Sequence, residues 1–163
     1  MTSSISVQKR NGTVEALDLN KMHKMVDAAC EGLGGVSSSQ VEMKSGIQFF
    51  DGISTAEIQE ILIHLDSPNY QFVAARLLLF SIRKSLYGVM QETPCFYEHI
   101  LKCVDAKVYD KEILQKYTRE ELDTIGQWID HGRDFLFTYA GLRQVVDKYL
   151  VQDRSTGEVY ELP

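Results

Sequence analysis

The stretch from Tyr70 to Tyr87 constrains the fold most strongly, because it is apolar on nearly every side between Phe72 and Ile82. A surface helix keeps one polar face, whereas a helix that is apolar all round is normally buried at the centre of a bundle. Gly88 follows the stretch, and glycine is typical of the position just after a helix end. The sequence therefore predicts a central helix over residues 70–87, with other helices packed around it.

Three shorter helices are predicted upstream of this central helix. The first begins after Asp18, a residue type that caps helices, and repeats apolar residues at steps of three and four. The second runs from the loop 37–39 to about Phe50. The third follows Ser54 and Glu57, which have the spacing of a capping box. Together with the central helix these segments predict a four-helix bundle.

Two segments have the pattern of β-hairpins. Residues 5–17 form two short extended runs around Asn11-Gly12, the residue pair that a two-residue type I′ turn prefers. Residues 149–162 form two extended runs around Ser155-Thr156-Gly157. We therefore predict one hairpin at the start of the chain and a second one at its end.

Shorter helices are predicted between the central helix and the second hairpin. Pro94 is placed to open a helix that runs to about residue 106, and a short helix is expected over 110–116. Thr118 and Glu121 form another capping box, and the helix that they open is expected to include Ile129. A last helix runs over residues 138–148.

These elements predict a mainly α fold in two parts. Residues 1–88 are expected to form one domain, a β-hairpin packed on the four-helix bundle. Residues 89–163 are expected to form a second, helical segment that ends in the C-terminal hairpin. His131-Gly132-Arg133-Asp134 is interpreted as a helix end with an internal Arg–Asp contact, and Trp128 as a core or interface residue.

Composition excludes several function classes. The 163 residues carry a net charge of −6, which repels nucleic-acid backbones at long range and argues against nucleic acid as the main partner. The start MTSSISVQKR lacks the apolar core of a signal peptide, and the apolar run 72–82 is too short to span a bilayer. The three cysteines, Cys30, Cys95 and Cys103, and the four histidines show no metal-site spacing. A cytoplasmic protein with free thiols, no metal site and no membrane contact is predicted.

The charged residues around the first hairpin are the strongest candidates for chemistry. If the hairpin packs on the first helix, Lys9, Arg10 and Lys21 can converge and hold a triphosphate, each charge-assisted hydrogen bond contributing about 1.5–3 kcal/mol. Glu15 and Asp18 offer acceptors for the exocyclic amine of adenine. On spacing alone, a solvated charged hairpin is the more ordinary interpretation.

The stretch VQKRNGTVEALDLNKM (7–22) resembles the opening of the ATP-cone, a small domain that senses ATP and dATP, and FFDGISTAEI (49–58) resembles a later segment of it. The resemblance implies that ATP or dATP, with Mg²⁺, binds as an allosteric effector. It places the phosphates on the hairpin cations and Lys21, and the base on Glu15 and Asp18. The nucleotide contacts that it implies are Val7, Lys9, Arg10, Glu15, Leu17, Asp18, Lys21, Met22, Phe49, Thr55 and Ile58.

The resemblance continues beyond the cone. Residues 68–88 look like the fourth cone helix of class Ia ribonucleoside-diphosphate reductase large subunits, and residues 109–122, 129–141 and 148–161 look like the segment that leads into their catalytic barrel. The resemblance implies an allosteric part of an oxidoreductase that makes deoxyribonucleotides for DNA replication. Its implied partners are the remainder of the large subunit and the radical-bearing small subunit. No segment resembles the radical-cysteine loop or the reducing cysteine pair, so no catalytic residue is predicted here.

Two positions depart from the family pattern. Gln59 stands where related reductases place a histidine beside the effector, and Ser85 stands where they tend to have a second lysine after Lys84. Losing two contacts of about 1.5 kcal/mol each weakens binding roughly a hundredfold if the losses add. The sequence therefore predicts weak adenine-nucleotide binding with little preference for dATP over ATP.

Two other function classes stay open at this point. One is a stand-alone ATP-cone regulator, such as the transcriptional repressors that carry this domain, and the other is a structural fragment that binds no nucleotide. Those repressors pair the cone with a cysteine-rich zinc ribbon and a basic face, and this chain has neither. The sequence also leaves open whether the 163 residues are a piece of a longer chain, a split-gene product or a truncated relic.

Overall fold

The chain divides into two compact units. The computed structural model describes residues 6–8, 13–16, 18–46, 68–90, 92–93 and 95–163. Residues 1–78 with 138–140 belong to the N-terminal unit, and residues 79–137 with 141–163 belong to the C-terminal unit. The domain boundary that the sequence predicts at residue 88 stays a prediction. The fold class is confirmed, because the described residues are mainly helical and the strands form small antiparallel sheets.

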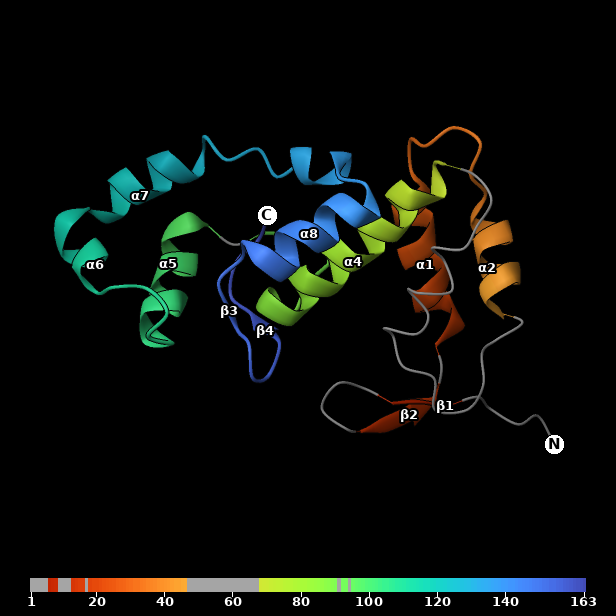
Figure 1. Cartoon of the computed structure of the whole chain (residues 1–163), viewed down its shortest axis with the longest axis horizontal. Coiled ribbons are helices and arrows are strands. Elements are labelled where there is room, and N and C mark those ends of the chain that lie inside the picture. Colours follow the sequence, from red (N-terminus) through yellow and green to blue (C-terminus); the bar gives the residue numbers. More distant parts are fainter. Residues whose placement is uncertain (1–5, 9–12, 17, 47–67, 91, 94) are drawn as a thin grey trace. The chain divides into compact units, whose positions relative to one another are not determined.

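The N-terminal unit opens with a short two-stranded ladder (Figure 1). Strands β1 (Ser6–Gln8) and β2 (Val14–Ala16) pair antiparallel, with Val7 opposite Glu15. This pairing confirms the predicted hairpin, whereas its Asn11-Gly12 turn lies outside the described residues.

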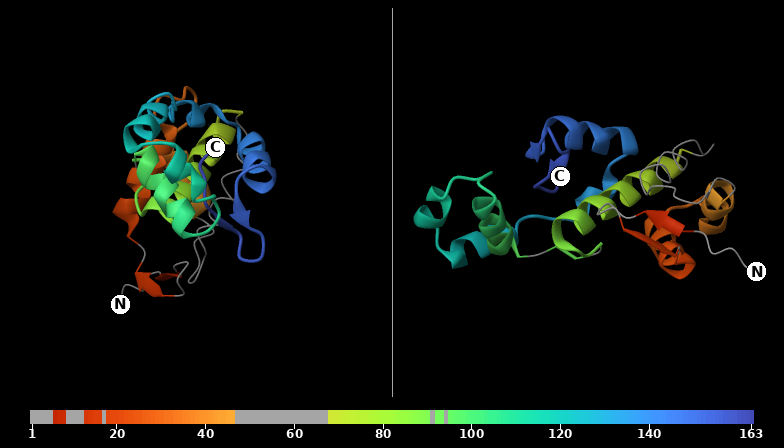
Figure 2. Two further views of the ribbon diagram at one scale, coloured as in Figure 1. Left: turned by 90° about the vertical axis from the view of Figure 1, so that its left-hand side faces the viewer. Right: turned by 90° about the horizontal axis from the view of Figure 1, so that it is seen from below.

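Helices α1 (Leu19–Cys30) and α2 (Ser38–Gly46) follow and lie side by side (Figures 1 and 2). Val26 and Ala29 of α1 and Val41 of α2 are buried. Burial of apolar side chains such as these stabilises the packing of the unit. The third predicted helix lies outside the described residues.

Helix α4 (Tyr70–Tyr87) has the bounds that the sequence predicts. Its residues Val73, Leu77 and Leu79 are among the most deeply buried of the described chain, as expected of a helix that is apolar all round. Gly88 follows with a φ of +78°, a left-handed conformation in which glycine pays no side-chain penalty. The first half of α4 belongs to the N-terminal unit and the second half to the C-terminal unit.

The C-terminal unit is built from short helices and a small hairpin (Figure 2). In chain order its elements are α5 (Phe96–Asp105), α6 (Glu112–Lys116), α7 (Arg119–Gly126), the 3₁₀ helix η1 (Arg133–Leu136), α8 (Tyr139–Lys148), β3 (Gln152–Asp153) and β4 (Glu158–Val159). The first two residues of α8 belong to the N-terminal unit.

The capping box that the sequence predicts for α7 is present. The Glu121 N–H donates to Thr118 Oγ1 at 3.2 Å, and the Thr118 N–H donates to Glu121 Oε2 at 2.8 Å. The expected extension of this helix to Ile129 is wrong. The N–H groups of Trp128 and Ile129 donate to carbonyls three residues earlier, which tightens the chain and ends the α-helix at Gly126.

The structure also bears on the predictions for Trp128 and for the second hairpin. Trp128 is not a core residue, because it lies after the end of α7 and is 78% exposed, and its alternative role at an interface stays a prediction. The second hairpin is confirmed, with Gln152 opposite Val159. Asp153 holds its turn, since Asp153 Oδ1 accepts from the Ser155 N–H at 2.8 Å and the Gly157 N–H donates to the Asp153 carbonyl at 2.7 Å.

Candidate functional site

The first turn of α1 carries three of the residues that the sequence places at a nucleotide. Asp18 is the N-cap, with an extended backbone, and its Oδ1 accepts from the N–H of Asn20 at 3.1 Å and of Lys21 at 3.2 Å. A cap of this kind stabilises a helix by about 1 kcal/mol, because it satisfies N–H groups that have no partner within the helix. Asp18 therefore fixes where α1 begins.

The side chain of Lys21 is the accessible cation of this turn. Its Nζ lies 3.6 Å from Asp18 Oδ2, and the two side chains are 81% and 46% exposed. The Lys21 backbone hydrogen bond and the nearby Lys21 ammonium lower the pKa of Asp18, so its carboxylate is ionised at neutral pH. The ammonium is free to leave this weak surface pair for a stronger anion such as a phosphate.

The short connection to the hairpin places further predicted residues near this turn. Val7 and Glu15 are register partners in the ladder, and Glu15 precedes Asp18 by three residues. Three residues of extended chain span at most about 11 Å, so the backbone of Glu15 lies near the start of α1. Met22 is half-buried one turn after Asp18, and its N–H donates to the Asp18 carbonyl at 3.2 Å.

The structure thus brings together Asp18, Lys21 and Met22, and it joins Val7 with Glu15 across the ladder. Whether all eleven predicted residues share one site stays a prediction. The remaining residues of the predicted site lie outside the described residues, and these are Lys9, Arg10, Leu17, Phe49, Thr55 and Ile58.

The geometry of Asp18 limits its role. Two of the α1 N–H groups already donate to its Oδ1, so they are not available to a phosphate. Only Oδ2, beside the Lys21 ammonium, remains to accept from a base amine. The turn is therefore suited to hold an anion through Lys21 and an amino group through Asp18, rather than to bind phosphate on the helix end.

The other end of α1 is held in place by α4. Arg76 Nη1 donates to the carbonyls of Ala29 at 3.1 Å and Glu31 at 2.6 Å, which are among the last carbonyls of α1 and its cap. Asn69 Nδ2 donates to the Gly34 carbonyl at 2.6 Å in the following loop. These bonds orient α1, and hence the turn that carries Asp18 and Lys21.

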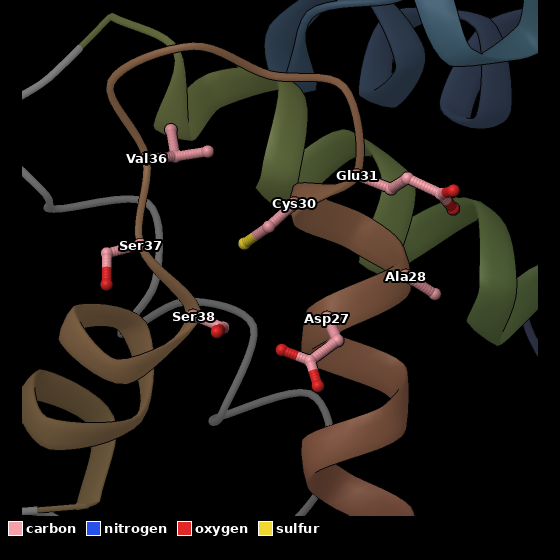
Figure 3. Close-up of a pocket in the computed structure, with 7 residues that line it drawn as sticks. All are labelled: Asp27, Ala28, Cys30, Glu31, Val36, Ser37 and Ser38. Carbon is pink, nitrogen blue, oxygen red and sulfur yellow. The ribbon is translucent and has the colours of Figure 1, made fainter.

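A pocket of about 620 Å³ lies at this C-terminal end of α1 (Figure 3). Its walls include the carboxylates of Asp27 and Glu31, the thiol of Cys30 and the hydroxyls of Ser37 and Ser38. The described residues that line it include no lysine or arginine, and two carboxylates repel a phosphate. The sequence places the nucleotide site at the opposite end of the helix.

Within the C-terminal unit, the predicted Arg–Asp contact of the 131–134 motif is wrong in its partner. Asp134 pairs with Arg83 of α4, whose Nη2 lies 3.0 Å from Asp134 Oδ2 and 3.2 Å from the His131 carbonyl. The guanidinium also lies 5.2 Å from the ring centroid of Phe135. The position of Arg83 directly after the apolar run of α4 was the one sequence signal of a buried charge. Its partner Asp134 is 51 residues away, so local spacing does not reveal the pair.

Neither a metal centre nor a spanning helix is found in the described part of the chain. Its histidine, cysteine and acidic side chains form no group of three that could hold a metal ion. None of its helices is long and apolar enough to cross a membrane. The cysteines at positions 30, 95 and 103 are free thiols, as predicted.

Comparisons with known proteins show which family and which proteins the chain resembles. Residues 5–85 match the family model of the ATP cone domain. Over 99% of its length the chain is 48% identical to the ribonucleoside-diphosphate reductase subunit alpha of Haemophilus influenzae, and 46% identical to the ribonucleoside-diphosphate reductase 1 subunit alpha of Escherichia coli. It is 40% identical to the corresponding subunit of Enterobacteria phage T4 over 98% of its length. The chain spans 22% of the length of each of these relatives.

Proposed function

We propose that this chain, which belongs to the ATP cone family through residues 5–85, is the nucleotide-sensing part of a ribonucleoside-diphosphate reductase alpha subunit. The chain corresponds to the N-terminal region of such subunits. The similarity runs on through residues 89–163, beyond the cone. This continuation favours a reductase subunit over a stand-alone ATP-cone regulator.

The proposed ligand is ATP or dATP, bound where the hairpin meets α1. Lys21 would contact the phosphates together with Lys9 and Arg10, and Mg²⁺ would accompany the triphosphate. Asp18 Oδ2 and Glu15 would accept from the amino group of adenine. The observation that carries this proposal is the first turn of α1, where one exposed ammonium and one ionised carboxylate lie side by side directly after the ladder.

The remaining predicted residues would complete the walls of the site. Leu17 and Met22 would pack beside the base, whereas Thr55 would contact the nucleotide from the later cone segment. Phe49 and Ile58 would line that side with apolar surface. Met22 supports this assignment, because it is half-buried in the same turn as Lys21.

In this role the nucleotide is an effector and not a substrate. An effector acts by binding one arrangement of the whole enzyme more tightly than another, so the cone only needs to bind and to report occupancy. We propose that the remainder of the large subunit supplies the chemistry that replaces the ribose 2′-OH with hydrogen. The radical-bearing small subunit would be the second partner.

Effector binding is expected to be weak. Gln59 carries no charge where related reductases have a histidine, and Ser85, exposed on α4, is shorter and uncharged where they tend to have lysine. We propose little preference for dATP over ATP. The substitutions Gln59→His and Ser85→Lys are then expected to strengthen binding.

Calorimetric titration of the full chain with ATP and dATP tests the proposal. Lys21→Ala is expected to weaken binding roughly tenfold, as one lost charge-assisted contact of about 1.5 kcal/mol implies. Lys24→Ala is the matched control, because Lys24 is also exposed on α1 but is not among the predicted contacts. Equal losses in both variants, or no heat of binding from either nucleotide, would contradict the proposed site.

A further inference from the structure

The C-terminal unit contains a second cavity, of about 720 Å³. It is bounded by the end of α4, by α5, by the last turns of α7 and by residues 161–163. Its aromatic lining residues include Tyr87, Phe96, His99 and Tyr109, and the imidazole of His131 also lines it. Pockets that bind small molecules have volumes of about 300–1,000 Å³ and aromatic walls with a few fixed polar groups.

A chain of hydrogen bonds fixes two of these walls. His99 Nδ1 lies 3.0 Å from the Tyr87 hydroxyl, and His99 Nε2 lies 3.6 Å from Cys103 Sγ. The Cys103 thiol donates to the Tyr160 carbonyl at 3.6 Å, so its sulfur is left to accept from His99 Nε2–H. The Tyr87 hydroxyl therefore donates to Nδ1. The protons of the Tyr87 hydroxyl, His99 Nε2 and the Cys103 thiol are thus all donated within this hydrogen-bond network. None of them is available to a ligand in the cavity.

A second set of bonds fixes Glu161. The Tyr109 hydroxyl donates to Glu161 Oε1, and the Val151 N–H donates to Oε2 at 2.9 Å. Each carboxylate oxygen keeps a further lone pair that can accept another hydrogen bond. Glu161 is thus held in place with its negative charge still open to an additional donor.

Asp123 supplies another acceptor. Its Oδ2 lies 3.5 Å from Arg119 Nε, whereas its Oδ1 is buried and has no hydrogen-bond partner among the described residues. A buried carboxylate oxygen without a donor is costly, and in folded proteins such atoms are uncommon. Asp123 also lines the cavity, so a ligand donor there can satisfy this oxygen once the side chain turns towards the cavity.

The charged groups of the described cavity wall are carboxylates, and Asp123 is the one that is paired with Arg119. Burial lowers the pKa of His99 and raises the pKa of Tyr87 to about 12, so both side chains are neutral at pH 7. Burial also raises the pKa of Tyr109. Among the described residues that line the cavity there is no lysine or arginine, and the carboxylates are those of Asp123 and Glu161.

We propose that this cavity binds a small organic ammonium ion. The ammonium would donate to the Glu161 carboxylate and to Asp123 Oδ1, which a turn of the Asp123 side chain would expose to the cavity, and its substituents would pack on the rings of Phe96 and Tyr109, where cation–π attraction adds to burial. A metal ion suits the cavity less, because the described residues hold no group of three metal-ligating side chains. This proposal is independent of the nucleotide site at α1.

The test uses benzylammonium and benzyl alcohol, which have the same ring and differ in charge, in an NMR titration of the full chain. Benzylammonium is expected to bind with a Kd on the order of 1 mM, as eight non-hydrogen atoms allow, and benzyl alcohol at least tenfold more weakly. Asp123→Asn and Glu161→Gln are each expected to weaken benzylammonium binding at least tenfold. Glu120→Gln, which removes the same charge from an exposed position on α7, is expected to leave it unchanged.

Three results would overturn the proposal. Equal binding of benzyl alcohol would show that charge plays no part. An equal loss in Glu120→Gln would show only long-range attraction to an acidic protein. No binding of benzylammonium at concentrations well above the expected Kd would show that the cavity takes no ammonium ligand, whatever the variants do.

Discussion

In the N-terminal unit the pair Asp18–Lys21 lies in solvent, with side chains that are 46% and 81% exposed, whereas in the C-terminal unit the pair Asp134–Arg83 is buried, with side chains 8% and 3% exposed. Exposed pairs contribute about 0–1 kcal/mol to stability and exchange partners easily. Buried pairs cannot lose one member without leaving an unpaired charge inside the protein.

The comparison separates two uses of charge. Lys21 is available to a ligand because its own partner holds it weakly. Arg83 is not available, because it is surrounded by Asp134, the His131 carbonyl and the Phe135 ring. The polar residues at the start of α1 are exposed, as the proposed nucleotide site requires, whereas those between α4 and η1 are buried and stabilise the C-terminal unit.

The largest expected effect is the loss of the buried pair. Arg83→Ala leaves Asp134 charged and buried, and we expect the free energy of unfolding in urea to fall by about 3–5 kcal/mol. The control is Arg143→Ala, which breaks an exposed pair with Asp147 in the same unit and is expected to cost less than about 1 kcal/mol. Similar losses in the two variants would erase the distinction between buried and exposed charge.

A smaller loss is expected where two helices meet closely. A Cβ atom at Gly126 of α7 would lie 2.5 Å from Phe96 Cβ of α5, so Gly126→Ala must push the helices apart. We expect a cost of about 1–3 kcal/mol in urea unfolding. Gly34→Ala, where a Cβ would meet nothing within 4 Å, should change stability little. An unchanged unfolding midpoint for Gly126→Ala would show that α5 and α7 can move apart without a loss of stability.

The Asp18 cap is expected to matter less for stability than for geometry. Asp18→Ala removes the acceptor for two N–H groups and should cost about 1 kcal/mol of unfolding free energy. Asp18→Asn keeps an acceptor and should retain most of that stability while it loses the ionic contact with Lys21. If Asp18→Asn destabilised the chain as much as Asp18→Ala, the ion pair with Lys21, and not the helix cap, would be the contribution of Asp18 to the free energy of unfolding.

The smallest expected effect is a pH dependence in the C-terminal unit. Burial lowers the pKa of His99 below its ordinary value of 6.5, so in acid the unfolded chain takes up a proton that the folded chain resists. This stability is present above about pH 6.5 and is lost as the pH falls through that value towards the lowered pKa. Urea midpoints at about pH 7.5 and about pH 5.5 should differ less for His99→Gln than for the unaltered chain. Identical differences would rule out His99 as a source of the pH dependence.

Local chemistry made much of the fold predictable. Asp18, Thr118 and Glu121 satisfy N–H groups within one turn, so their spacing alone located the starts of α1 and α7. Gly88 marked the end of α4 in the same way, because a residue without a side chain adopts its φ of +78° at no steric cost. Each of these signals acts over a few residues and is therefore visible in the sequence.

Long-range pairing was the part that the sequence did not reveal. Arg83 and Asp134 meet across 51 residues, and Tyr109 meets Glu161 across 52. No local pattern distinguishes these side chains from solvated ones, as the wrong partner predicted for Asp134 illustrates. The nucleotide contacts were inferred from family resemblance, and for the described part of that site the structure adds the dual position of Asp18, as cap and as neighbour of Lys21.

Hydrogen exchange of the full chain with and without ATP locates the nucleotide site, because it reports binding along the whole backbone in one measurement. We expect slower exchange in β1, β2 and the first turns of α1 when ATP is present, and unchanged exchange over residues 96–163. Protection centred on residues 96–163, or no protection at saturating ATP, would contradict the assignment of nucleotide sensing to the N-terminal unit.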